Sequence, residues 1–163
     1  MKFTQQAVID APINQVDLEN WLFTLSDADY QAASRGHRGA GSFTEDGVRG
    51  TVNLESIGGT LMVQHYHEVS AEPTRVEMLS KRTRAYVFHL IPVHFLVRWT
   101  MTATPRTSDT TTFGCTVEVE MPAWLRVAAG SIFTPHFLRK HVDEEAPNFA
   151  ADISRKLATF TRV

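Results

Sequence analysis

Two stretches in the second half of the chain alternate apolar and polar residues with a period of two, and this alternation limits the possible folds most strongly. In residues 93–103 every second side chain is apolar. Residues 113–121 repeat the pattern, with Glu118 and Glu120 on the opposite face. Such alternation is typical of antiparallel strands that bury one face. The chain is therefore expected to build a half-buried antiparallel sheet.

A hairpin is predicted on either side of Gly58-Gly59. Glycine supplies the positive φ that two-residue β turns need, so residues 48–57 and 60–69 should pair as neighbouring strands. In this register Glu55 lies opposite Met62, and the two faces of the hairpin separate cleanly.

The two faces differ in character. The more polar face carries Thr51, Asn53, Glu55, Met62, Gln64, Tyr66 and Glu68. The other face carries Val52, Leu54, Leu61, Val63, His65 and His67. If the polar face looks inward, the apolar residues of the other face form an exposed surface, which a homodimer interface could cover.

Helices are expected at both ends of the strand run. Before the hairpin we expect a strand at 3–10, short helices at 13–24 and from Ser26 to about Ser34, and a glycine-rich loop with at most one irregular strand at 35–47. After the hairpin we expect either two strands, at 74–81 and 84–91, or one strand bent at Arg82-Thr83. A short helix should follow the last strand at 123–133. Thr134-Pro135 should begin a long helix, because threonine caps first-turn amides and proline fits the first helical position. This helix should reach about residue 160, with a kink at Pro147.

Strands and helices are segregated along the chain, which favours an α+β fold. A length of 163 residues fits one domain, residues 1–163. The element order resembles the helix-grip superfamily, which includes START domains, birch-pollen-allergen-like proteins and polyketide cyclases. The phrases at residues 8–13 and 68–73 carry part of this resemblance. It implies a curved antiparallel sheet wrapped around the long C-terminal helix, with an internal cavity for a small apolar or aromatic ligand.

Charge and composition exclude several classes of function. The net charge is −2, and the basic residues are scattered, so no nucleic-acid surface is expected. No apolar run approaches the roughly 18 residues that a membrane span needs, and the first residues lack the pattern of a signal peptide. We therefore expect a cytoplasmic protein without membrane insertion. Cys115 is the single cysteine, which excludes a disulfide framework and a multi-cysteine zinc site within one chain.

The strongest chemical signal is the pair His141 and Glu145. Residues four apart on a helix lie on the same face, within reach of one ion, and imidazole and carboxylate both bind zinc and similar divalent metals. The alternative is an ordinary pair on the surface of a helix. The pair shares its stripe with Phe137, Phe149 and Ile153, which should face the sheet, and this favours a metal role. His37, in a glycine-rich loop, and Glu55 are candidates for further ligands.

A closer resemblance covers Trp21-Leu22-Phe23, Asp27 with Tyr30, and the segments around these four candidates. In that order they resemble the zinc-dependent diacetylphloroglucinol hydrolase family, whose members hydrolyse a carbon–carbon bond between an acyl group and a phenolic ring. The resemblance implies that His37, Glu55, His141 and Glu145 hold zinc or another divalent metal. Glu68 lies on the same predicted face as Glu55 and could replace it.

Three functions follow from these patterns. The first is a metal-dependent hydrolase of a small acylated phenol or aromatic ketone, in which Tyr66, Asn53 or Arg82 assists as an acid or an orienting group. The second is a START-like binding or carrier protein for an apolar small molecule, without metal. The third is a polyketide cyclase or aromatase that uses cavity residues alone. Because a fold supplies a pocket without choosing its chemistry, the choice depends on the site.

Overall fold

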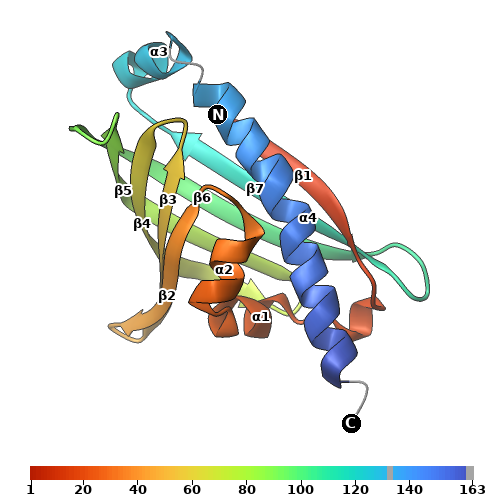
Figure 1. Cartoon of the computed structure of the whole chain (residues 1–163). Helices are drawn as coiled ribbons and strands as arrows, with labels where there is room; N and C mark the ends of the chain where they lie inside the picture. Colours follow the sequence, from red (N-terminus) through yellow and green to blue (C-terminus); the bar gives the residue numbers. More distant parts are fainter. Residues whose placement is uncertain (132–133, 161–163) are drawn as a thin grey trace.

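A computed structural model describes residues 1–131 and 134–160 of the chain. Within these residues seven antiparallel strands form one sheet in the order β1-β7-β6-β5-β4-β3-β2 (Figure 1). The strands are β1 (Lys2–Ile9), β2 (His37–Glu45), β3 (Val48–Ile57), β4 (Thr60–Glu72), β5 (Arg75–Val87), β6 (Ile91–Pro105) and β7 (Thr111–Glu120). The helices are the 3-10 turn η1 (Ile13–Gln15), α1 (Leu18–Thr24), α2 (Asp27–Ala33), α3 (Ala123–Ser131) and α4 (Thr134–Phe160).

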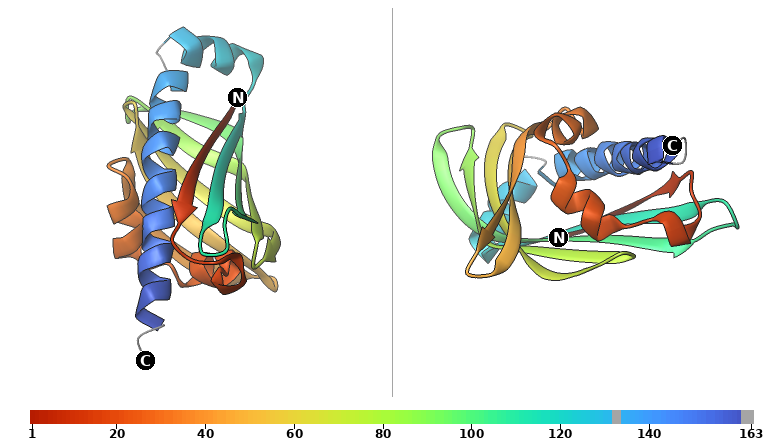
Figure 2. Two further views of the ribbon diagram at one scale, coloured as in Figure 1. Left: turned by 90° about the vertical axis from the view of Figure 1, so that its right-hand side faces the viewer. Right: turned by 90° about the horizontal axis from the view of Figure 1, so that it is seen from below.

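The sheet curves, and the long helix α4 lies along its inner side (Figures 1 and 2). The short helices α1 and α2, which follow β1 and precede β2 in the chain, cover another part of the same side. This arrangement confirms the predicted α+β, helix-grip architecture, with two short helices after the first strand. No helix among the described residues is long and apolar enough to cross a membrane.

The hairpin register is confirmed. β3 and β4 pair Glu55 with Met62 and Asn53 with Gln64, and the turn glycines Gly58 and Gly59 both have positive φ. The polar face of this hairpin points inward, and its residues from Thr51 to Tyr66 on that face are buried. Burial of this face is what brings polar side chains into the interior next to α4.

Several element boundaries differ from the prediction. The helix expected at 13–24 is interrupted, because the Asp17 side chain accepts a hydrogen bond from the Asn20 amide and begins α1 anew. The loop expected at 35–47 contains a nine-residue strand, β2, since its backbone pairs with β3 despite the glycines. A bulge between His37 and Gly39 interrupts this pairing.

In the second half of the chain the structure decides between the one-strand and two-strand predictions for residues 74–91. β5 is one strand, and its register against β6 shifts between Ser80 and Thr83, at the bend predicted there. α3 ends at Ser131, and residues 132–133 of the predicted helix lie outside the described residues. α4 continues through Pro147, so the proline does not end the helix.

The outer face of the hairpin is partly exposed, as predicted for an inward polar face. Leu54 is exposed, and Val52 and Val63 are half-buried. The core beneath the inner face is aromatic. Trp21 packs edge-on against Phe149 with ring centroids 5.0 Å apart, and it donates a hydrogen bond to Asp152. These contacts attach α1 to α4.

Replacing Gly50 with alanine should destabilise the fold, because a Cβ atom there would lie 2.3 Å from the backbone oxygen of Tyr66 and 2.3 Å from the Phe43 ring. The ring can move, whereas the paired backbone of β4 cannot. We expect Gly50→Ala to lower the free energy of unfolding by about 2 kcal/mol, measured by urea denaturation. Gly41→Ala in β2 is the matched control, since a Cβ there meets nothing within 4 Å. Equal effects of the two substitutions would contradict this account.

Candidate functional site

Four ionisable side chains from three elements meet under α4. His37 begins β2, Glu55 lies on β3, and His141 and Glu145 lie one turn apart on α4; all four are buried. Pairing of β2 with β3 puts His37 opposite Glu55, and the helical repeat puts the other two residues on one face. The fold therefore assembles a cluster, named here the His/Glu cluster, from segments far apart in the sequence.

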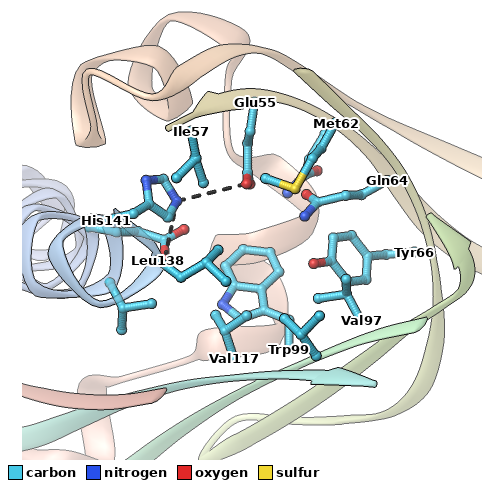
Figure 3. Close-up of a pocket in the computed structure, with 14 residues that line it drawn as sticks. Glu55, Ile57, Met62, Gln64, Tyr66, Val97, Trp99, Val117, Leu138 and His141 are labelled. Carbon is cyan, nitrogen blue, oxygen red and sulfur yellow. Dashed lines mark ion pairs between the residues drawn. The ribbon is translucent and has the colours of Figure 1, made fainter. Parts of the chain in front are cut away.

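The donor atoms of the His/Glu cluster are close together. Nε2 of His141 lies 3.8 Å from Oε2 of Glu55 and 4.0 Å from Oε2 of Glu145 (Figure 3). Nε2 of His37 lies 3.5 Å from Oε1 of Glu145. One donor atom from each of His37, Glu55 and His141 lies within 4.8 Å of the others, and Glu145 contacts both histidines through its two oxygens.

Hydrogen bonds from outside the cluster orient its members. Nδ1 of His37 donates to the backbone carbonyl of Tyr30, and the Tyr30 hydroxyl donates to Oε1 of Glu55 at 2.6 Å. Nδ1 of His141 shares a hydrogen bond with the Ser34 hydroxyl at 3.1 Å. In both histidines Nδ1 thus forms a hydrogen bond with a neighbouring protein group, and Nε2 points toward the cluster centre. Histidines that bind metals are commonly held in this way by a partner on the other ring nitrogen.

The two carboxylates of the cluster favour positive charge on the groups next to them. Burial lowers the pKa of His37, but the hydrogen bond and charge of Glu145 outweigh it, so the net pKa is raised. Burial likewise raises the pKa of Glu145, but the hydrogen bond from His37 and the charges of both histidines outweigh it, so the net pKa is lowered. Two carboxylates facing each other across two imidazoles need a cation, either protons on the rings or a metal ion.

The donor set fits a divalent metal. Nε2 of His37 is buried, and its contact with Oε1 of Glu145 spans 3.5 Å, longer than an ordinary hydrogen bond. Two neutral imidazole nitrogens and two carboxylates are a ligand set that zinc accepts, and similar divalent metals use the same atoms. The residues present are therefore able to hold such an ion.

A narrow cavity of about 20 Å³, little more than the room that one water molecule needs, lies beside the His/Glu cluster. Its walls combine the cluster residues Glu55, His141 and Glu145 with Asn53, Ile57, Met62, Gln64, Tyr66, Val97, Trp99, Val117, Val119, Leu138 and Val142 (Figure 3). Burial, reinforced by the charges of Glu55 and Glu145, raises the pKa of Tyr66, so its phenol stays protonated. A small molecule in this cavity would meet apolar walls, the cluster at one side and a few polar groups.

The other residues considered from the sequence lie as follows. Asn53 and Tyr66 line the cavity. Glu68 does not join the cluster, because its Oε2 forms an ion pair with Arg49 at 2.7 Å. Arg82 is exposed and lines a groove on the outer face of the sheet, so it does not line the cavity.

Sequence reasoning missed two neighbours of the cluster. Ser34 supports His141, and the only sequence signal is its position at the end of a short helix. Cys115 is buried, as its apolar strand face indicates, but its Sγ also lies 3.8 Å from Oε2 of Glu145. Burial, with the Glu145 charge, raises the pKa of the Cys115 thiol, so the protonated thiol is a hydrogen-bond donor to that carboxylate.

Comparison with known proteins identifies the fold. No family model and no curated protein sequence matches the chain. A protein from Thermus thermophilus is similar with a TM-score of 0.64 at 11% identity, over 99% of both chains. An aromatase/cyclase from Streptomyces sp. R1128 gives 0.64 at 9% identity, covering 96% of this chain and 95% of its own. A START superfamily protein from Mycobacterium smegmatis gives 0.50 at 16% identity, covering 87% and 94%.

We expect zinc to stabilise the protein through the His/Glu cluster. Zinc that binds only the folded state adds about 2.7 kcal/mol to the free energy of unfolding when its free concentration is about 100 times the Kd. For a chain of this size this should raise Tm by roughly 5–11 °C. His141→Ala and Glu145→Gln should abolish the shift, measured by scanning calorimetry with elemental analysis of the purified protein.

His67→Ala is the matched control for the zinc experiment. His67 also faces a carboxylate, Oε2 of Glu45 at 3.3 Å, but this pair is exposed on the outer face. The control variant should keep the zinc-dependent shift. A shift that survives in the folded His141→Ala variant would place the metal elsewhere.

Proposed function

We propose that this protein is a metal-dependent hydrolase that cleaves the carbon–carbon bond between an acyl group and a phenolic ring, or a related aromatic ketone, inside the cavity. The observation that carries the proposal is the buried His/Glu cluster, whose two Nε2 atoms and two carboxylates converge beside that cavity. A purely structural interior has little reason to bury four ionisable groups together, because desolvation costs several kcal/mol for each ion. The proposal also rests on the resemblance to the diacetylphloroglucinol hydrolase family.

His37, Glu55, His141 and Glu145 would hold zinc or another divalent metal. When bound, such an ion supplies Lewis acidity toward a ketone oxygen and lowers the pKa of water. The remaining roles belong to cavity residues. Trp99 and the aliphatic wall exclude bulk water and pack against an aromatic ring, and Asn53 offers an amide that orients a polar substituent.

The overall reaction balances without a redox partner. The oxygen of water forms a bond to the acyl carbon, and the bond from that carbon to the ring breaks with its electron pair going to the ring carbon. The ring carbon then takes a proton, which gives a carboxylic acid and the deacylated phenol. Hydroxyl groups next to the breaking bond help the ring accept the electron pair and the proton. The Tyr66 phenol, which its raised pKa keeps protonated, is the cavity group suited to donate a hydrogen bond to the substrate.

Incubating the zinc-loaded protein with 2-acetylphloroglucinol should release acetate and phloroglucinol, measured by liquid chromatography. Tyr66→Phe should lower kcat by about 10²-fold or more, the usual range for loss of a hydrogen-bond donor to the transition state, with zinc content unchanged. Glu55→Gln should lower activity and zinc content together. Zinc-loaded protein that cleaves no acylated phenol would refute the hydrolase and leave the metal site standing.

A second candidate is a START-like carrier or a cyclase that acts on an aromatic ligand without metal. Its support is the similarity of fold to a START superfamily protein and an aromatase/cyclase, together with the largely apolar cavity wall. In this case the His/Glu cluster would serve only as a buried polar network.

The carrier is distinguished by ligand binding that ignores metal. Quenching of the Trp99 fluorescence by a flat polyphenol such as naringenin would then give the same Kd with and without a chelator. His37→Ala, which lies outside the cavity wall, would leave that Kd unchanged, whereas Val117→Phe, which fills the cavity without adding a tryptophan, would abolish quenching. A Kd that rises about tenfold or more, about 1.4 kcal/mol, on chelation would instead support the metal-dependent function.

A further inference from the structure

One end of the molecule exposes large apolar side chains from three separate segments. Phe88 and Leu90 lie in the turn between β5 and β6, Ile91 begins β6, Trp124 lies on α3, and Phe137 lies near the start of α4. Their exposed fractions run from 40% for Phe137 to 80% for Leu90. These five residues are named here the apolar end. Figure 1 shows α3, the start of α4 and the tips of the β3–β4 and β5–β6 hairpins at this end.

The segments of the apolar end meet around one turn. A Cβ atom on Gly58 would lie 2.6 Å from the Phe137 ring, and a Cβ atom on Gly59 would lie 3.9 Å from the Phe88 ring. The β3–β4 turn is therefore flanked by both phenylalanines. In α3, Leu125 is buried while its neighbour Trp124 is 66% exposed, so the helix anchors one side and presents the tryptophan.

Basic residues predominate in the segments that meet at the apolar end. Lys81, Arg82 and Arg84 lie on β5, Arg126 on α3, and Arg139 and Lys140 on α4, while Glu120 is an acidic residue at the end of β7. Arg82 and Arg84 lie with Tyr86 on the outer side of the sheet and line one groove there. Tyr86 is two residues before Phe88, so this cationic groove borders the apolar end.

We propose that the apolar end docks on a membrane surface that contains anionic lipids. Exposed aromatic and aliphatic tips insert at the headgroup–acyl boundary, and neighbouring Lys and Arg are attracted to lipid phosphates. A second copy of this chain fits the surface less well, because a symmetric contact would bring two cationic ends together. The proposal stands on the surface alone and does not depend on the reaction assigned to the cavity.

Docking at this end would turn the cavity toward the bilayer. Ile57 and Leu138 line the cavity, and they are the chain neighbours of Gly58 and Phe137. An apolar ligand dissolved in the membrane would thus meet the cavity lining without crossing bulk water. The partly exposed apolar residues Leu54 on β3 and Val8 on β1 line neither this cavity nor the groove of Arg82 and Arg84, and they provide a control surface.

Trp124 gives a direct measurement, because the other two tryptophans, Trp21 and Trp99, are buried. Large vesicles of phosphatidylglycerol and phosphatidylcholine (1:1) should shift Trp124 emission to the blue and shield it from acrylamide. The protein should co-sediment with these vesicles and much less with pure phosphatidylcholine. Added salt should weaken the binding, because it screens the lipid charge.

The double variant Leu90→Ser/Ile91→Ser should lower the partition coefficient between vesicles and water about tenfold or more, because each substitution removes apolar area that the membrane would bury. Arg82→Gln/Arg84→Gln should lower it only for the anionic vesicles. Leu54→Ser/Val8→Ser is the matched control and should leave it unchanged, with all variants checked by circular dichroism. Absence of binding to anionic vesicles, or equal loss in the control, would overturn the proposal. A concentration-dependent dimer in light scattering that Leu90→Ser/Ile91→Ser abolishes would reassign the surface to a protein contact.

Discussion

The interior of this protein is organised by the need to bury two carboxylates and two imidazoles in one place. An isolated buried charge is too costly for a fold of marginal stability, so each member of the His/Glu cluster has both a charged neighbour and a neutral hydrogen-bond partner. The neutral partners from the first part of the chain, the Tyr30 hydroxyl and carbonyl and the Ser34 hydroxyl, come from α2 and the residue that ends it. The short helix α2 thus has a specific task, which is to support the cluster through Tyr30 and Ser34.

Attachment of α2 to α4 follows from the same requirement. The Asn148 amide donates to the backbone carbonyl of Ala33, and Lys156 and Arg155 form ion pairs with Asp29. These contacts continue along α4 for about four turns beyond His141. They are mostly exposed and individually weak, but together they fix the rotation of α4 about its axis. A rotation by one residue, about 100°, would turn His141 and Glu145 away from His37 and Glu55.

Local signals in the sequence determined the parts of the fold that local chemistry controls. The β3–β4 register follows from two turn glycines and the alternation of Asn53, Glu55, Gln64 and Tyr66, and the pairing of His141 with Glu145 follows from helical spacing. The strand β2 could not be predicted with the same certainty, because its glycines have weak strand propensity and its hydrogen bonds come from β3. The contacts of Ser34 and Cys115 depend on tertiary packing across 107 and 30 residues, and no local pattern encodes them.

The structural neighbours and the His/Glu cluster constrain different levels of function. Proteins at 9–16% identity share the sheet and the long helix, and a fold of this kind supplies a cavity without fixing its chemistry. The chemistry depends on which side chains the inner strands and α4 present. In this chain the polar face of β3 and β4 is directed inward, at the cost of placing Leu54 on the outside. An inward polar face is unfavourable for a simple apolar carrier, because groups such as Oε1 of Gln64, which has no hydrogen-bond partner among residues 1–131 and 134–160, lose hydration there. A ligand with polar substituents restores those hydrogen bonds, which favours a functionalised aromatic molecule over a plain hydrocarbon.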